Sequence, residues 1–367
     1  MNPTQATPDR PSFGCCSFRI KAEDGTCVVA RVNELGMEAR SQIVFQPSGR
    51  SFTSKAPGGG PGKTWTSRYA FLGINGLGLP ASFGDGMNEA GLSMEGLFFD
   101  DSRYEAPGPG EAAVSVGSND FVSWVLGNFA TVDEVKAALA SVRVWSETVG
   151  AVGATFPLHF AIHDAAGRCI VVEFIDGEKK VYDNPLGVMT NLPELPWHLT
   201  NLGNYLNLNT RIPGSIDFAG TMARPFGTGG GWLGMPGDWT SPSKFVRIAY
   251  LVHCTGSPRD RAGAINLAKH ILNTVDIPKR SVDAQIKNEK TGDGLDGEYS
   301  QWSLLLDLTN RVMFYFTYDD MNLKCIDLRK MVRDGTREVR VIPMEQDFSA
   351  VDMTDRMTSP GQGPGRG

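Results

Sequence analysis

The sequence lacks the features of a membrane protein or of a nucleic-acid-binding protein. No apolar run approaches the roughly 18–20 residues of a membrane span. The formal net charge is −6, and no basic stripe reverses it, which argues against non-specific binding of nucleic acid. We therefore expect neither a membrane nor a nucleic acid among the partners of this chain.

Signatures of metal binding and of a disulfide framework are also missing. The 6 cysteines are scattered, with no CxxC and no metal-ligand spacing. His159 and His163 share one face of an expected strand, but a third ligand is not evident, and core or surface histidines are the simpler interpretation. Residues 1–14 have neither the basic start nor the apolar stretch of a secretory signal. We expect free thiols, no metal, no organic cofactor and a cytoplasmic location.

Two glycine-rich segments resemble phosphate-binding motifs but lack the required context. The GKT at 62–64 would need a glycine at position 57, which is proline, and the residues after it are typical of a strand rather than a helix. The glycines within 229–234 match GxGxxG, yet no strand precedes them. Neither segment predicts a nucleotide site.

The 367 residues, 41% hydrophobic and 21% charged, have the composition of a globular protein with an ample core. Strand patterns at both ends of the chain and helical patterns between them indicate a layered sheet-and-helix fold. A hairpin is expected around Asp24-Gly25, and Thr131 with Glu134 forms a capping box that opens a helix. Expected helices cover 119–129, 132–141, 243–254 and 261–274, and expected strands include 159–163, 169–175, 179–182, 187–190, 302–308 and 312–318.

The pair Cys15-Cys16 follows the polar segment 1–14. If the chain is cleaved between Gly14 and Cys15, that cysteine carries both a thiol and a free α-amine. An α-amine with an ordinary pKa of ~7.7–8.0 can accept the thiol proton, and an arginine nearby, such as Arg31, would favour the thiolate. Considered alone, the pair is typical of two small buried residues in a strand.

Five segments further along the chain change that interpretation, because they occur in a fixed order. They are CCSFRIKAEDGTCVVARVNELG, FGDGMNEAGLSMEGLFF, GVMTNLPELPWHLTNL, GMPGDWTSPSKFVRIAYL and HILNTVDIPK. Together they resemble the choloylglycine hydrolase family, which includes bile salt hydrolases and penicillin V acylases. The resemblance runs from Cys15 to about Tyr318. It implies an α+β fold, the four-layer αββα sandwich of the N-terminal-nucleophile hydrolases, in a single domain at 15–350. We expect residues 1–14 to be a leader that is removed and 351–367 to be a disordered tail.

The resemblance also implies roles for residues of the N-terminal hairpin. Cys15 occupies the position of the nucleophile, Arg31 that of the arginine flanking the thiol, and Glu34 a position where these hydrolases usually carry aspartate. If the loop at Asp24-Gly25 has two residues, Cys15 lies opposite Glu34, and the carboxylate stands beside the α-amine. Arg31 would then point to the other face of the sheet unless a bulge intervenes.

Three further residues are assigned by the same resemblance. Asn191 matches the asparagine whose side-chain amide helps to form the oxyanion hole, and Arg247 matches a second active-site arginine. Phe98 falls where bile salt hydrolases tend to have asparagine and penicillin V acylases tyrosine. Considered alone, Asn191 is typical of a turn and Arg247 of a solvated helix.

The expected function is hydrolysis of a linear, non-peptide amide of an N-acyl compound through an acyl-enzyme. Penicillin V, an N-acyl homoserine lactone, a fatty-acyl amide and a conjugated bile salt are the candidate substrates. The alternative is an unprocessed, non-catalytic relative that acts as a binding scaffold. Relatives in the family are commonly tetramers, so we expect a homo-oligomer.

Overall fold

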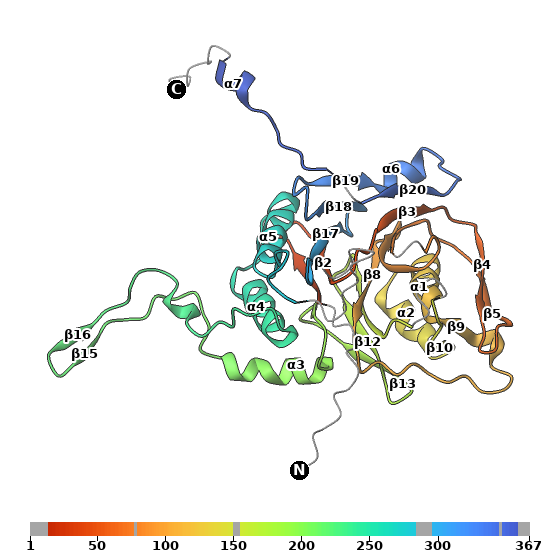
Figure 1. The fold of residues 1–367 in the computed structure, drawn as a ribbon, viewed down its shortest axis with the longest axis horizontal. Helices are drawn as coiled ribbons and strands as arrows, with labels where there is room; N and C mark the ends of the chain where they lie inside the picture. Colours follow the sequence, from red (N-terminus) through yellow and green to blue (C-terminus); the bar gives the residue numbers. More distant parts are fainter. Residues whose placement is uncertain (1–13, 77–78, 150–154, 284–295, 345–346, 359–367) are drawn as a thin grey trace.

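Two β-sheets packed face to face, with helices on both outer sides, make up the body of the protein (Figure 1). The structure, a computed structural model, describes residues 14–76, 79–149, 155–283, 296–344 and 347–358. The first sheet has the order β14-β1-β2-β17-β18-β19. Its strands are β14 (Val188–Met189), β1 (Cys15–Lys21), β2 (Cys27–Leu35), β17 (Tyr299–Asp307), β18 (Val312–Thr317) and β19 (Lys324–Asp327).

The second sheet is antiparallel throughout and has the order β13-β12-β11-β8-β7-β6-β3-β20. Its strands are β13 (Glu178–Asp183), β12 (Cys169–Ile175), β11 (Leu158–Asp164), β8 (Leu92–Phe98), β7 (Phe83–Asn88), β6 (Phe71–Asn75), β3 (Gln42–Gln46) and β20 (Arg340–Pro343). Strands from both ends of the chain therefore meet in each sheet, as the sequence pattern predicted.

Helices cover the two outer faces. The first sheet is covered by α4 (Ser241–Cys254) and α5 (Arg261–Asn273), and the second by α1 (Phe121–Asn128) and α2 (Val132–Leu139). Three apolar cores result: one under α4 and α5, one under α1 and α2, and one between the sheets. The expected four-layer αββα sandwich is confirmed.

Local sequence signals explain why these helices form where they do. The Oγ1 atom of Thr131 accepts a hydrogen bond from the backbone N–H of Glu134 at 3.2 Å, and Glu134 in turn accepts one from the N–H of Ala130. This reciprocal cap satisfies backbone donors at the start of α2, which lack partners within the helix. The four expected helices and the six strands expected between 159 and 318 all form, with bounds that differ by a few residues at most.

Smaller elements lie around the sandwich. They are α3 (Leu195–Asn201), α6 (Leu328–Arg333), α7 (Thr354–Thr358), and the strand pairs β4 (Ser51–Lys55) with β5 (Pro61–Thr66), β9 (Ser115–Gly117) with β10 (Arg143–Trp145), and β15 (Ile216–Phe218) with β16 (Thr221–Ala223). The hairpin β15–β16 forms the tip of an arm that projects away from the sheets (Figure 1). Among the described helices, none is long and apolar enough to cross a membrane.

Both expected terminal segments fall largely outside this description. Of the leader at 1–14, Gly14 is described and residues 1–13 lie outside the described residues. Helix α7 lies within the segment 351–367, and residues 359–367 are again outside. Removal of the leader and disorder of the tail therefore stay predictions.

Candidate active site

Cys15 is the first residue of β1, and its side chain lines a pocket between the two sheets. The wall of the pocket is mixed, with apolar side chains beside a small number of polar ones. Its described lining includes Cys15, Arg31, Asn33, Leu35, Ile74, Asn75, Leu79, Phe83, Asp85, Phe98, Phe156, Leu158 and Trp302. Cys15 is 3% exposed, so its side chain is sheltered beside a space that a ligand can enter.

The hairpin register differs by one residue from the expected one. Cys15 pairs with Asn33, not with Glu34, because the β1–β2 loop has three residues rather than two. Gly25 closes this loop with φ of +86°, a left-handed conformation that glycine adopts at little cost, and the N–H of Ala22 donates to the carbonyl of Thr26. The shift moves every β2 side chain to the other face relative to Cys15.

Arg31 consequently lies on the same face as Cys15, which corrects the expectation that it would point away. Its Nε donates to Oδ1 of Asp85 at 2.7 Å, and its Nη2 donates to the carbonyl of Gly96 at 2.9 Å. Burial lowers the pKa of Arg31, but the Asp85 carboxylate and the Cys15 sulfur raise it more. The guanidinium therefore stays charged next to the thiol.

Asn191 follows β14 and joins Cys15 to the second sheet. Its Oδ1 accepts a hydrogen bond from the backbone N–H of Cys15 at 2.7 Å, and its Nδ2 donates to the carbonyl of Phe98 at 2.7 Å. The backbone of Asn191 is itself fixed, because its N–H donates to Oγ of Ser241 at 2.8 Å and its carbonyl contacts Nε2 of His198 at 2.9 Å. The amide is thus held in one orientation beside the thiol.

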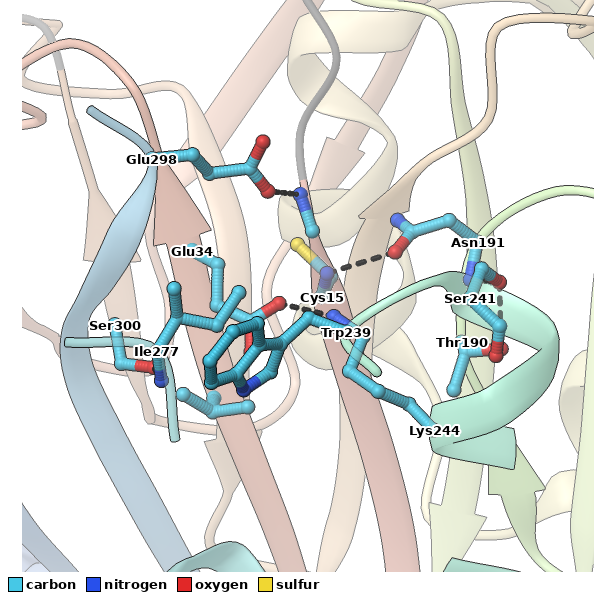
Figure 2. A network of polar contacts seen from close by, with 12 residues as sticks. Cys15, Glu34, Thr190, Asn191, Trp239, Ser241, Lys244, Ile277, Glu298 and Ser300 are labelled. Carbon is cyan, nitrogen blue, oxygen red and sulfur yellow. Dashed lines mark hydrogen bonds and ion pairs between the residues drawn. The ribbon is translucent and has the colours of Figure 1, made fainter. Parts of the chain in front are cut away.

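Glu34 lies on the other face of the sheet, toward α4. Figure 2 shows its carboxylate beside the ammonium of Lys244, with Glu298, the residue before β17, approaching the residue before Cys15. The expectation that Glu34 stands directly across from Cys15 is therefore wrong. Glu34 is still adjacent to the residue before Cys15, because its backbone N–H donates to the carbonyl of Gly14 at 3.0 Å and its carboxylate lies beside the Gly14 α-carbon.

Arg247 does not line the pocket. It is on α4, and its Nη1 donates to the carbonyl of Pro236 at 2.6 Å and to that of Asp238 at 3.2 Å. Its Nε and Nη2 are buried, and neither makes a hydrogen bond within the described residues. Burial lowers the pKa of Arg247, and Asp238 opposes this effect. Arg247 therefore fixes the loop that contains Pro236 and Asp238 to α4.

Cys16 provides an internal contrast to Cys15. It is fully buried under α4, and burial, followed by the Glu34 charge, raises the pKa of its thiol to about 12. A thiol with that pKa stays protonated at neutral pH and is a poor nucleophile. The two faces of β1 thus place the Cys15 side chain in the pocket and the Cys16 side chain in the core under α4.

Several residues of the site were not singled out from the sequence. They are Asp85 on β7, Asn33 on β2, Lys244 on α4, and Glu298, which is the residue before β17. Asp85 and Lys244 lie in segments quoted for the resemblance, FGDGMN and SPSKFVR, but no local pattern distinguished them. Across the described ranges, no group of three or more His, Cys, Asp or Glu residues is arranged to hold a metal ion.

His159 and His163 are both buried, as expected for core histidines. Nε2 of His159 contacts the carbonyl of Thr190 at 2.8 Å, and its Nδ1 contacts Glu173 at 3.2 Å, which helps to fix the segment before Asn191. Nε2 of His163 lies 3.5 Å from Glu95, and burial lowers the pKa of His163 to about 3. Both rings are therefore held by contacts to neighbours inside the protein.

Comparisons with known proteins show a family and a set of relatives. The sequence model of the linear amide C–N hydrolases, choloylglycine hydrolase family, matches residues 15–340. A bile salt hydrolase/transferase of Clostridium perfringens is 30% identical over 324 residues, which are 88% of this chain and 94% of that protein. A solved variant of conjugated bile acid hydrolase from the same organism has a TM-score of 0.79 at 26% identity, covering 92% of this chain and 99% of that one.

A penicillin V acylase from Agrobacterium tumefaciens shares the fold, with a TM-score of 0.70 at 22% identity over 90% of this chain and 91% of that one. The family match begins at Cys15 and spans both sheets and the covering helices. On these grounds the chain belongs to the choloylglycine hydrolase family, whose members hydrolyse linear amide C–N bonds.

Proposed function

We propose that this protein hydrolyses a linear amide of an N-acyl compound with Cys15 as an N-terminal nucleophile. The observation that carries the proposal is the arrangement of Cys15, whose backbone nitrogen is held by Asn191 at 2.7 Å while its side chain lines the pocket beside Arg31. A nucleophile, an orienting group and a charged neighbour within one site are the parts that covalent catalysis requires.

In the proposed reaction the Cys15 sulfur attacks the substrate carbonyl carbon, and its proton passes to the α-amine. The second hydrogen of the Asn191 amide stabilises the oxyanion, together with the backbone near Phe98. The C–N bond breaks as the α-amine returns the proton to the leaving amine, and an acyl-enzyme remains. Water then releases the acid and restores the thiol.

This mechanism requires removal of residues 1–14. Two hydrogen bonds hold the peptide between Gly14 and Cys15: the Gly14 carbonyl accepts from the N–H of Glu34, and the Cys15 N–H donates to Asn191. A third, from the Gly14 N–H to Glu298, holds the peptide unit before it. A fixed peptide next to a thiol suits attack by Cys15 on the Gly14 carbonyl, although a separate peptidase could also cleave there. The rival function, a binding scaffold, applies if the leader remains attached.

Substrate preference is proposed from Phe98 and its neighbours. Phe98 offers no side-chain donor or acceptor, and Leu35, Phe83, Phe156 and Trp302 extend the apolar wall. Flat apolar surfaces favour phenoxyacetyl or fatty-acyl groups over the hydroxylated face of a bile acid, because polar groups placed against such a wall lose hydrogen bonds to water.

Kinetics with penicillin V, a medium-chain N-acyl homoserine lactone and glycocholate test both the activity and this preference. We expect kcat/KM for at least one of the first two to exceed that for glycocholate by about tenfold, equivalent to roughly 1.4 kcal/mol. A tenfold preference for glycocholate over both would show that Phe98 does not set specificity. Absence of turnover for every N-acyl amide, in protein whose mass shows Cys15 as first residue, would contradict the proposed function.

We also propose that the chain forms a homo-oligomer through the arm that carries β15 and β16. Ile216, Phe218 and Met222 are at least half exposed on this arm, which extends away from the sandwich (Figure 1). Exposed apolar groups gathered on a projecting hairpin are typical of an interaction surface.

Light scattering after size-exclusion chromatography measures the oligomeric state. The double variant Ile216→Ser/Phe218→Ser is expected to lower the mass per particle, because it removes apolar area from the proposed contact. Val341→Ser, which changes a similarly exposed apolar residue on β20, serves as the control and should leave the mass unchanged. A monomeric unmodified protein would contradict the proposal.

A further inference from the structure

Asn33 is the polar side chain that lies directly across from Cys15 in the pocket. It pairs with Cys15 on β1 and with Trp302 on β17, and paired residues of antiparallel strands point to the same face of a sheet. Cys15, Asn33 and Trp302 all line the pocket, and we call them the pocket row. Asn191 approaches Cys15 from the other side of β1, where β14 lies (Figure 2). The thiol therefore lies between two amide side chains.

The protein makes little use of the Asn33 amide. Among the described residues, its one polar contact is between Oδ1 and Sγ of Cys15 at 4.0 Å, and its Nδ2 donates to no partner. Another amide of the pocket wall, Asn75, is engaged at both ends, since its Nδ2 donates to Oε1 of Gln42 at 3.0 Å and its Oδ1 accepts from the N–H of Gln42 at 3.0 Å. Asn33 is only partly buried, so its unused donor is open to the pocket.

The place of this amide matches one atom of an acyl chain. In an acyl-enzyme the carbonyl carbon is bonded to Sγ of Cys15, and the third atom of the acyl chain is three bonds from the sulfur. Because these bonds are ~1.5–1.8 Å long, that atom lies ~3–4 Å from Sγ. An acyl chain that runs along the pocket row toward Trp302 brings its third atom beside Asn33. The apolar remainder of the chain then meets Leu35 and Trp302.

We propose that Asn33 is a specificity-determining residue whose Nδ2 donates a hydrogen bond to an oxygen at the third atom of the acyl group. The substrate class is an amide of an acid with an ether, keto or hydroxyl oxygen there, such as a phenoxyacetyl or 3-oxoacyl amide. This inference rests on the proposed function and narrows it, because an apolar wall alone does not separate these acids from plain fatty acids. A methylene group at that place covers the amide and leaves its donor without water or partner, which is unfavourable.

The experiment compares two pairs of amides that differ only at the third acyl atom. N-phenoxyacetyl homoserine lactone is paired with its 3-phenylpropanoyl analogue, in which a methylene group replaces the ether oxygen. N-(3-oxooctanoyl) homoserine lactone is paired with N-octanoyl homoserine lactone. For each pair, the ratio of kcat/KM for the oxygen-bearing amide to that for the plain amide is measured in the unmodified protein and in Asn33→Leu. Comparison of the ratios between the two proteins cancels the difference in intrinsic reactivity within a pair.

Asn33→Leu should lower both ratios by about fivefold or more, because it removes a net hydrogen bond from the oxygen-bearing amide alone. The value of kcat/KM for the plain amide should stay within about threefold or rise, since leucine has a similar size and suits a methylene group. Asn33→Ala also removes the donor and should change the ratios in the same direction, so it decides the matter if the leucine variant does not fold. Circular dichroism checks the fold of each variant.

Asn119→Leu is the matched control. Asn119 belongs to the short helix η2 (Ser118–Asp120) and also lines the pocket, but it lies outside the pocket row. Any effect of this variant should be shared by both members of a pair and leave the ratios within about twofold of the unmodified values. A ratio that falls as far in Asn119→Leu as in Asn33→Leu would overturn the inference, because the polarity of the whole pocket would then set the preference.

Other results would also overturn it. Equal losses for both members of each pair in Asn33→Leu would show that Asn33 acts on the Cys15 thiol. Unchanged kinetics would show that the amide has no part in the choice of acyl group. Penicillin V and N-phenoxyacetyl homoserine lactone share one acyl group. If Asn33→Leu changes the ratio between these two and not the ratios within the acyl pairs, Asn33 contacts the leaving amine instead.

Binding to the full-length Cys15→Ala variant separates this inference from the proposed function. This variant has no sulfur to acylate, so isothermal titration calorimetry measures recognition of the four amides without turnover. Addition of Asn33→Leu should lower the affinity ratio within each pair by about fivefold. If the affinity ratios fall but the unmodified protein hydrolyses no amide, the role of Asn33 stands and the amidase does not. Hydrolysis with unchanged ratios gives the opposite result, and absence of both binding and hydrolysis overturns both.

Discussion

A Cys15→Ala variant of the full chain is expected to lose about 10⁴-fold or more in kcat/KM toward an N-acyl amide. The side chain supplies the nucleophile of the proposed reaction, and the other groups of the site act on that nucleophile, so their contribution largely disappears with it. If the thiol also cleaves the leader, the variant should keep residues 1–14. Intact mass and N-terminal sequencing measure this second effect on the same sample.

Cys16→Ala is the matched control, because it changes the neighbouring thiol on the opposite face of β1. Burial raises the pKa of the Cys16 thiol to about 12, so this residue contributes packing rather than chemistry. We expect kcat/KM within about threefold of the unmodified enzyme and a loss of about 1 kcal/mol in the free energy of unfolding. A chain that begins at Cys16 and tolerates Cys15→Ala would show that the assignment is wrong by one residue.

The register of the β1–β2 hairpin could not be predicted from the sequence to within one residue. The Asp24-Gly25 pair correctly predicts a hairpin, but it suits both a two-residue loop and a three-residue loop that ends in a left-handed glycine. The structure has the second, with Gly25 at φ of +86°. Since side chains alternate along a strand, that single residue decides whether Arg31 or Glu34 shares the face of Cys15.

Local signals were sufficient elsewhere. The helices α1, α2, α4 and α5 and the strands from β11 to β13 follow from apolar periodicity and from caps such as Thr131, because these features act over a few residues. The four-layer architecture came from the family resemblance, which the strand and helix order permitted but did not establish.

The charged partners of the site could not be found in this way. Arg31 and Asp85 are separated by 54 residues, Glu34 and Lys244 by 210, and Gly14 and Glu298 by 284. A charged residue that pairs across such a separation has the same local appearance as one on a solvated surface. The fold brings these groups together. In the first sheet β1, β2 and β17 are neighbours, and β7 of the second sheet faces them across the pocket.

The second large effect is expected at Asn191, where two roles can be separated. Its Oδ1 accepts from the Cys15 nitrogen, and its Nδ2 donates to the carbonyl of Phe98, which leaves a second Nδ2 hydrogen for an oxyanion. Asn191→Ala removes both roles. We expect kcat to fall by about 10²–10³-fold with KM changed by a few-fold at most, because oxyanion stabilisation acts in the transition state rather than in substrate binding.

Asn191→Asp is the matched comparison, since it keeps the shape and the acceptor toward the Cys15 amine but removes both N–H donors. If donation to the oxyanion is the main contribution, the Asp variant should be as impaired in kcat as the Ala variant. Steady-state kinetics at several pH values measure this, and circular dichroism checks that both variants fold. An Asp variant with kcat close to that of the unmodified enzyme would show that Asn191 anchors the α-amine and that another donor stabilises the oxyanion.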